Sequence, residues 1–118
     1  LRQQGRVTVV LGQPVLWKEQ PTAGESATLW FWLESPVGAI RASPGWMLDE
    51  MRRYNTAQQR RAMDAGVAFV GLDERIPKDL NHYFDDCHYT DLGSSLVADT
   101  ILPVLKDAVG NILQAKRN

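Results

Sequence analysis

The 118-residue sequence contains a single cysteine, Cys87, which excludes an internal disulfide framework and any metal site built from several cysteines. Neither sign of charge is in excess, because 13 Lys and Arg face 14 Asp and Glu and leave a formal net charge of -1. This balance provides no general electrostatic attraction to nucleic acid or to an anionic membrane. No apolar run approaches the roughly 20 residues of a membrane-spanning helix. We therefore expect neither a nucleic-acid partner nor a membrane span.

What the sequence does contain is typical of globular proteins, with 44% hydrophobic and 23% charged residues. Its length suffices for one compact domain and not for two. Two continuous apolar segments, Val7–Leu11 and Val67–Leu72, predict strands that are covered on both faces, as in a parallel sheet.

A long amphipathic helix is predicted between these strands. Ser43 is a suitable N-cap, Pro44 is tolerated in the first turn, and Gly66 ends the helix. The apolar stripe of this helix is expected to comprise Leu48, Met51, Tyr54, Gln58, Ala62 and Ala65. The order strand–helix–strand predicts a βαβ unit with a right-handed crossover.

A last helix is predicted from about Asp91, with Thr90 as its cap, a bend at Pro103 and fraying from Gly110 onward. Its apolar stripe is expected to comprise Leu92, Leu96, Val97, Ile101, Val104, Leu105 and Ala108. Between the first strand and the long helix, Glu25–Leu33 favours a short helix.

The edges of the predicted sheet point to missing polypeptide. Two parallel strands alone leave two open edges, whereas sheets usually have about five strands. We therefore expect residues 1–118 to form a single partial domain, completed by further sequence or by a partner chain.

The chemistry-bearing residues follow the second strand. In α/β sheets, sites are built where the chain leaves the carboxyl ends of the strands. Asp85 and His88 lie three residues apart there, a spacing that allows the carboxylate to hold one ring nitrogen while the other accepts a proton from a hydroxyl. By itself this spacing is a weak signal, because it is more often found in a structural loop carboxylate beside a surface histidine.

The sequence around this pair resembles the C-terminal block of the SGNH (GDSL) hydrolases, a family of esterases and lipases. Members carry a closing Asp-x-x-His motif, then a hydroxyl residue, a glycine and a helix of small and apolar residues. The matching residues here are Asp85-Asp86-Cys87-His88-Tyr89-Thr90-Asp91-Leu92-Gly93, continuing through Leu96-Val97-Ala98. Less specific support comes from Val9–Lys18, Tyr54-Asn55 and Val67–Val70.

The resemblance implies an α/β fold, namely the C-terminal part of a flavodoxin-like three-layer α/β/α domain. It further implies that His88 is the general base of a serine ester hydrolase, and that Asp85 orients it. No cofactor and no metal are implied, and the expected partners are a small-molecule or carbohydrate ester and the N-terminal part of the same domain. Of the neighbouring residues, we expect Asp86 to be loop structure, His82 a turn residue and Cys87 a packed thiol.

The family's Gly-Asp-Ser nucleophile block and its oxyanion-hole blocks are not present in this sequence. None of the five serines of the chain has the neighbouring residues of that nucleophile block or its position between a strand and a helix. They are Ser26, Ser35, Ser43, Ser94 and Ser95. Since the nucleophile precedes the acid and the histidine in related α/β hydrolases, we expect it upstream of Leu1, and we expect this chain alone to be inactive.

Two other interpretations stay open at this point. The first is a truncated or non-catalytic SGNH-like binding module with an aromatic surface at Trp17, Trp30 and Trp32, although rings of this size also suit core packing. The second is a zinc or manganese site whose ligands are His82, Asp85, Asp86 and His88.

Overall fold

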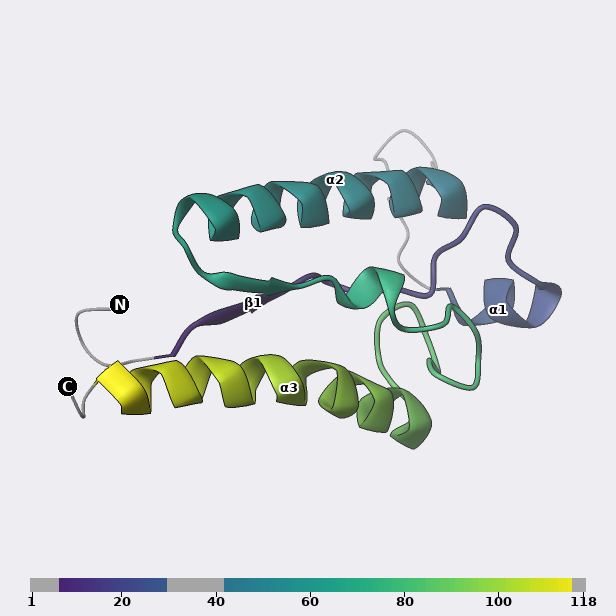
Figure 1. The fold of residues 1–118 in the computed structure, drawn as a ribbon. Helices are drawn as coiled ribbons and strands as arrows, with labels where there is room; N and C mark the ends of the chain where they lie inside the picture. Colours follow the sequence, from purple (N-terminus) through teal and green to yellow (C-terminus); the bar gives the residue numbers. More distant parts are fainter. Residues whose placement is uncertain (1–6, 30–41, 116–118) are drawn as a thin grey trace.

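The structure is a computed structural model that describes residues 7–29 and 42–115. Its elements in chain order are β1 (Val9–Leu11), α1 (Ala23–Thr28), α2 (Pro44–Asp64), β2 (Ala68–Val70), the 3-10 turn η2 (Leu72–Glu74) and α3 (Asp91–Ala115). The strands form a two-stranded parallel sheet that lies between α2 and α3 (Figure 1). The molecule is thus an α/β structure, as predicted. Within the described residues, no helix is long and apolar enough to cross a membrane.

Both strands are shorter than the sequence predicts. Val9 pairs with Ala68 and Leu11 with Val70, and the ladder ends where the N–H of Gly12 donates to the carbonyl of Val70 at 2.8 Å. The expectation that both strands are covered on both faces is wrong for the described residues, since Leu11 and Ala68 are exposed and only Val70 is buried. The physical reason is that each strand has one open edge there, so side chains beside that edge reach solvent although a helix lies on each face (Figure 1).

Helix α2 forms where the sequence predicts it. The Ser43 hydroxyl accepts a hydrogen bond from the Trp46 N–H at 3.2 Å, and Gly66 adopts a positive φ of 60° after the last turn. The predicted stripe is wrong at Tyr54, which is 54% exposed, and at Ala65, which is exposed at the C-cap. Asn55, the neighbour of Tyr54, takes the inward position, in step with the face that buries Leu48.

Helix α3 begins at Asp91, and the Thr90 hydroxyl accepts a hydrogen bond from the Gly93 N–H at 3.1 Å. The helix continues through Gly110, so the predicted fraying at that position is wrong. Leu92 and Leu105, which the sequence assigns to the core stripe, are exposed. The short helix α1 has a capping box made by Thr22 and Glu25; residues 30–33 of the predicted segment lie outside the described residues.

Apolar clusters lie on both sides of the sheet. The cluster on the α3 side contains Leu16, Val70, Leu72, Ile76 and Tyr83, against which Leu96, Val97, Ile101 and Val104 pack. The cluster on the α2 side contains Val15, Trp17 and Leu48, with Met47, Met51 and Cys87 against it. The chain that follows β1 contributes to both clusters, and it thereby joins the two helical layers.

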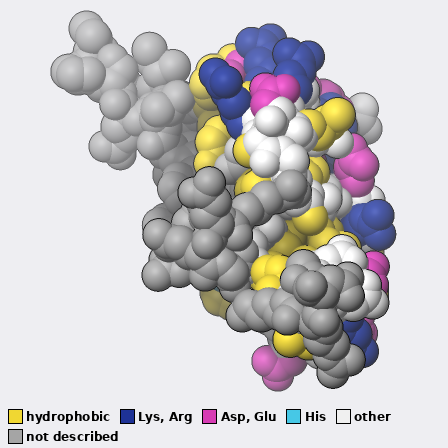
Figure 2. Space-filling model, turned by 60° about the vertical axis from the view of Figure 1, so that its left-hand side comes forward, with side chains coloured by type: hydrophobic (Ala, Val, Ile, Leu, Met, Phe, Trp, Pro, Cys, Tyr) yellow, Lys and Arg dark blue, Asp and Glu magenta, His cyan; other side chains and the backbone are white. Residues whose placement is uncertain are grey.

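A substantial apolar surface stays open to solvent. Leu102, Val109 and Leu113 are exposed, and their spacing of seven and four residues places them on one side of α3. Figure 2 shows hydrophobic side chains reaching the surface among charged ones on the face that it presents. Exposed apolar side chains that recur on one side of a helix are typical of an interface with other polypeptide.

Candidate active site

The candidate residues lie in the segment between η2 and α3, at the end of the sheet where both parallel strands finish (Figure 1). An antiparallel bridge between Tyr83 and Tyr89 closes a tight turn, and the Phe84 N–H donates to the carbonyl of His88 at 3.1 Å. Tyr83 is fully buried, and its ring centroid lies 5.4 Å from that of Tyr89. The core therefore holds the base of the turn, while Phe84 and His88 are exposed beside it.

Asp85 and His88 are brought together by this turn. The ring Nδ1 of His88 lies 2.8 Å from Oδ2 of Asp85 and 3.0 Å from Oδ1. Oδ1 also accepts the backbone N–H of Cys87 at 3.0 Å and that of His88 at 2.9 Å. The Asp85 side chain is 13% exposed and that of His88 is 58% exposed. The carboxylate is thus fixed by the backbone, and the imidazole that it orients faces solvent.

The protonation of this pair follows from the environment of the carboxylate. Burial raises the pKa of Asp85, but the backbone hydrogen bonds from Cys87 and His88 and the bond from the His88 ring outweigh it, so the pKa lies below its ordinary value. An ionised carboxylate only accepts hydrogen bonds, so Nδ1 of His88 carries the proton. In the neutral ring Nε2 then has a free lone pair, and no described residue hydrogen-bonds it. Phe84 stacks on the ring, with centroids 5.6 Å apart and planes 12° apart.

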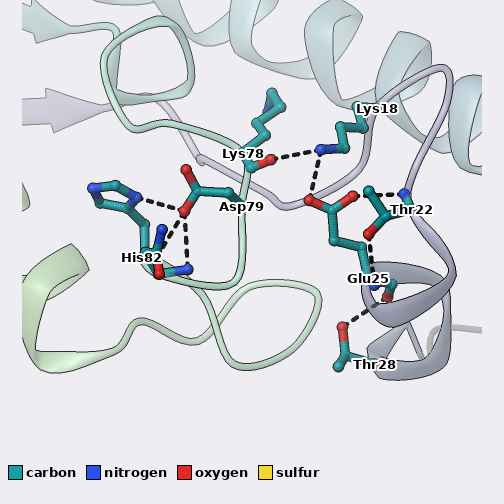
Figure 3. Close-up of polar contacts among 8 residues, drawn as sticks. Lys18, Thr22, Glu25, Thr28, Lys78, Asp79 and His82 are labelled. Atoms are coloured by element: carbon teal, nitrogen blue, oxygen red, sulfur yellow. Dashed lines mark hydrogen bonds and ion pairs between the residues drawn. The ribbon is translucent and has the colours of Figure 1, made fainter.

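A second pair with the same spacing precedes the first, and sequence reasoning missed it. The Asp79 Oδ1 lies 2.7 Å from Nδ1 of His82 and accepts the backbone N–H of Asn81 and of His82 (Figure 3). Burial raises the pKa of Asp79, but these bonds, led by the one from the His82 ring, bring it below its ordinary value. The His82 side chain is only 14% exposed, so this pair stabilises a turn, as predicted for His82. The sequence signal that could have revealed the Asp79–His82 pair is its Asp-x-x-His spacing, which is the same as that of Asp85 and His88.

Asp86 points away from the exposed pair and into the core. It is fully buried, its Oδ1 accepts the indole N–H of Trp17 at 2.5 Å, and its carbonyl accepts the Leu16 N–H at 2.9 Å. Asp86 therefore ties the turn to the chain that follows β1. Trp17 is buried, so its ring is not part of an exposed aromatic surface; Trp30 and Trp32 lie outside the described residues.

We expect Trp17→Phe to lower the free energy of unfolding by about 1.5–3 kcal/mol. The reason is that the buried carboxylate of Asp86 loses the hydrogen bond that the indole N–H of Trp17 donates to it. Urea denaturation of the chain measures this change. The matched control is Trp46→Phe, because Trp46 is 48% exposed, and its effect should stay within about 0.5 kcal/mol. Equal losses in the two variants would show that the indole hydrogen bond is unimportant.

Three further side chains brace the chain after β1, and each makes at least one hydrogen bond to a residue far away in sequence. Lys78 donates to the carbonyl of Val15 at 2.6 Å and to the carboxylate of Asp73. Burial, together with the charge of Arg52, lowers the pKa of Lys78 more than Asp73 raises it. Lys18 donates to Glu25 at 2.6 Å and to the carbonyl of Lys78 at 3.0 Å (Figure 3).

Asn55 of α2 completes this bracing. Its amide accepts the N–H of Gln13 at 2.7 Å and donates to the Gln13 carbonyl at 2.8 Å. Asn55 follows Leu48 by seven residues, a helical spacing that could have predicted its inward position. Nothing in the sequence indicates that Gln13 is its partner.

Cys87 is half-buried against the cluster of Val15, Trp17 and Leu48. Burial raises the pKa of its thiol, and the carboxylates of Asp85 and Asp86 raise it further. A thiol with a raised pKa is a poor nucleophile, which fits the expectation of a packed thiol. Its Sγ lies 3.9 Å from Nδ1 of His88.

No described serine hydroxyl is hydrogen-bonded to His88. Ser43 caps α2, Ser26 lies in α1, and Ser94 and Ser95 lie in α3, while Ser35 falls outside the described residues.

The alternative metal site of His82, Asp85, Asp86 and His88 is not brought together by the structure. Among the described residues, the one group of at least three metal-ligating side chains with converging ligand atoms comprises Asp85, Cys87 and His88. His82 is instead bound to Asp79, and Asp86 to Trp17.

A cavity of about 240 Å³ lies beside the turn. Its lining is mostly apolar and comprises Trp17, Ser26, Leu29, Ala42, Pro44, Met47 and Asp86. Neither Asp85 nor His88 lines it, so the exposed pair does not open into this cavity.

No family model, curated protein or solved structure matches the chain. The resemblance to the SGNH hydrolases therefore rests on the residues quoted for it.

Proposed function

We propose that this chain is the C-terminal part of an SGNH-type serine ester hydrolase, with His88 as general base and Asp85 as the acid that orients it. In this proposal the two strands belong to a larger parallel sheet of flavodoxin-like, three-layer architecture with a right-handed crossover. The nucleophilic serine and the oxyanion-hole donors come from further polypeptide of the same domain. The substrate is a carboxylic ester of a small molecule or a carbohydrate.

The observation that carries the proposal is the hydrogen bond between Asp85 and Nδ1 of His88, made by a carboxylate that two backbone N–H groups hold in place. This arrangement leaves Nε2 of an exposed ring free to take the proton of a serine hydroxyl as its oxygen attacks the ester carbonyl. The same nitrogen then returns the proton to the departing alcohol as the carbon–oxygen bond breaks. A water molecule then attacks the acyl group on the serine, and Nε2 takes its proton. The same nitrogen returns the proton to the serine oxygen as the carboxylic acid is released.

The surroundings of the pair support a site that is completed by other polypeptide. The His88 side chain is exposed, the nearby cavity does not include the pair, and the outer side of α3 presents Leu102, Val109 and Leu113 to solvent. A preceding part of the domain that pairs with the open sheet and packs on apolar surface would bring its serine to the same edge, because parallel strands finish there.

The test is labelling of the protein, expressed together with its upstream polypeptide, by a fluorophosphonate probe. We expect labelling of the intact protein, and we expect His88→Ala to abolish it, because the serine loses its base. The matched control is His82→Ala, which removes the buried histidine of the Asp79 pair and should leave labelling in place, provided that circular dichroism shows a folded protein.

Unchanged labelling of the His88→Ala protein would contradict the assignment of the base. An intact, folded protein that is never labelled would instead favour the non-catalytic binding module. The chain of 118 residues by itself should not be labelled.

A further inference from the structure

We propose that Asp85, Cys87 and His88 form a site for a thiophilic divalent cation, with Zn²⁺ as the preferred ion, and that its occupation switches His88 off as a base. The binding half of this inference stands on the geometry alone. The regulatory half rests on the proposed function.

The geometry of the three donors fits one ion. One ligand atom from each residue lies within 4.8 Å of the other two, and Sγ of Cys87 lies 3.9 Å from Nδ1 of His88. Around a tetrahedral Zn²⁺ ion with bonds of about 2.0–2.3 Å, ligand atoms are roughly 3.3–3.6 Å apart. Small side-chain rotations that open the 2.8 Å contact between Asp85 and His88 and close the sulfur contact reach this arrangement.

The backbone prepares the carboxylate for this role. Oδ1 of Asp85 is held by the N–H groups of Cys87 and His88, so Oδ2 is the oxygen available to an ion. Hydrogen bonds of this kind orient a ligating carboxylate and support metal affinity. The exposed ring of His88 leaves room for the ion to enter and for a water molecule as fourth ligand.

The donor set selects the class of cation. One sulfur, one imidazole nitrogen and one carboxylate oxygen suit Zn²⁺ or Cd²⁺, whereas Mg²⁺ and Ca²⁺ require oxygen ligands throughout. The nearby Asp79–His82 pair provides an internal comparison, because it has the same spacing and hydrogen bonds but carries Asn81 where the first pair carries Cys87.

The proton balance explains the switch. The ion takes the lone pair of Nδ1, so the ring proton is relocated from Nδ1 to Nε2, and the thiol of Cys87 releases one proton to solvent as the sulfur–metal bond forms. Nε2 then carries a hydrogen and can no longer accept the proton of a serine hydroxyl. Removal of the ion by a chelator restores the hydrogen bond between Asp85 and Nδ1 of His88, and with it the base.

The binding test is a titration of the 118-residue chain with Cd²⁺, followed by the ultraviolet charge-transfer absorption of the thiolate–cadmium bond, and with Zn²⁺ in competition with a chromophoric chelator. We expect one equivalent to bind. Cys87→Ala and Cys87→Ser should each weaken Zn²⁺ binding by at least about tenfold, since loss of a direct ligand costs no less than loss of a supporting residue. His82→Ala should not change the affinity.

Equal Zn²⁺ affinity in the unaltered chain and in a folded Cys87 variant, or no charge-transfer absorption with Cd²⁺, would overturn the site. A double variant with Asn81→Cys and Cys87→Ala moves the thiol to the Asp79–His82 pair. Cadmium charge-transfer absorption in this variant would further support the rule that an Asp-x-x-His pair with a cysteine directly before its histidine binds the ion.

The regulatory test uses the protein with its upstream polypeptide. Zn²⁺ should slow fluorophosphonate labelling, each variant being compared with its own metal-free rate, and Cys87→Ala should require at least about tenfold more Zn²⁺ for the same inhibition. Labelling that ignores bound Zn²⁺ would overturn the switch. Metal binding without any labelling would refute the proposed hydrolase and the switch that depends on it, while the binding site would stand.

Discussion

In the proposed hydrolase, we expect Asp85→Asn to lower kcat for ester hydrolysis by about 10⁴-fold, the size of effect seen when the acid of a Ser-His-Asp triad becomes an amide. The amide has nearly the shape of the carboxylate, so its oxygen can still accept the N–H groups of Cys87 and His88. Its NH₂ group, however, donates to Nδ1 of His88 and forces the ring proton onto Nε2. The histidine is then present and correctly placed, but in the wrong tautomer.

The measurement is the hydrolysis of an activated aryl ester by the complete protein of that proposal, in which upstream polypeptide supplies the serine. The matched control is Asp79→Asn, which makes the same chemical change in the buried Asp79–His82 pair and should cost less than about tenfold, because that pair only stabilises a turn. Because the pKa of Asp85 lies below its ordinary value, the native carboxylate stays ionised throughout the neutral range, and the deficit should persist across it. Similar losses in both variants would argue that each pair merely supports the loop.

The features that could be predicted from the sequence are those that depend on neighbours along the chain. Both long helices begin where a hydroxyl residue caps them, because Ser43 and Thr90 bond to N–H groups three residues away. The contact between Asp85 and His88 is equally local, since a turn of three residues suffices to make it. These interactions need no knowledge of the rest of the fold.

Errors arose where distant packing decides the outcome. A periodic pattern accommodates Tyr54 or Asn55 equally well, and Asn55 turns inward because it binds the backbone of Gln13, 42 residues away. In the same way, the burial of Asp86 depends on Trp17, 69 residues away. The strands were predicted too long and too well covered, because a strand's extent is set by the partner that it finds.

Gly93 lies where α3 approaches the turn closely, and its substitution is expected to have a large effect on stability. A Cβ added there would lie 2.1 Å from the carbonyl oxygen of His82, a backbone atom that cannot be displaced by a side-chain rotation. The same carbonyl accepts the Thr90 N–H at 3.1 Å, so the start of α3 and the turn are locked together. We expect Gly93→Ala to lower the free energy of unfolding by about 3 kcal/mol, the upper part of the range for forced overpacking.

The control for Gly93→Ala has the opposite expected sign. Gly110 lies in the same helix with nothing within 4 Å of an added Cβ, so Gly110→Ala should raise stability by up to about 1 kcal/mol through helix propensity alone. Urea denaturation of both variants separates contact from propensity. If Gly93→Ala were neutral or stabilising, α3 would not be seated on the carbonyl of His82. The turn that presents Asp85 and His88 would then lack the support of that helix.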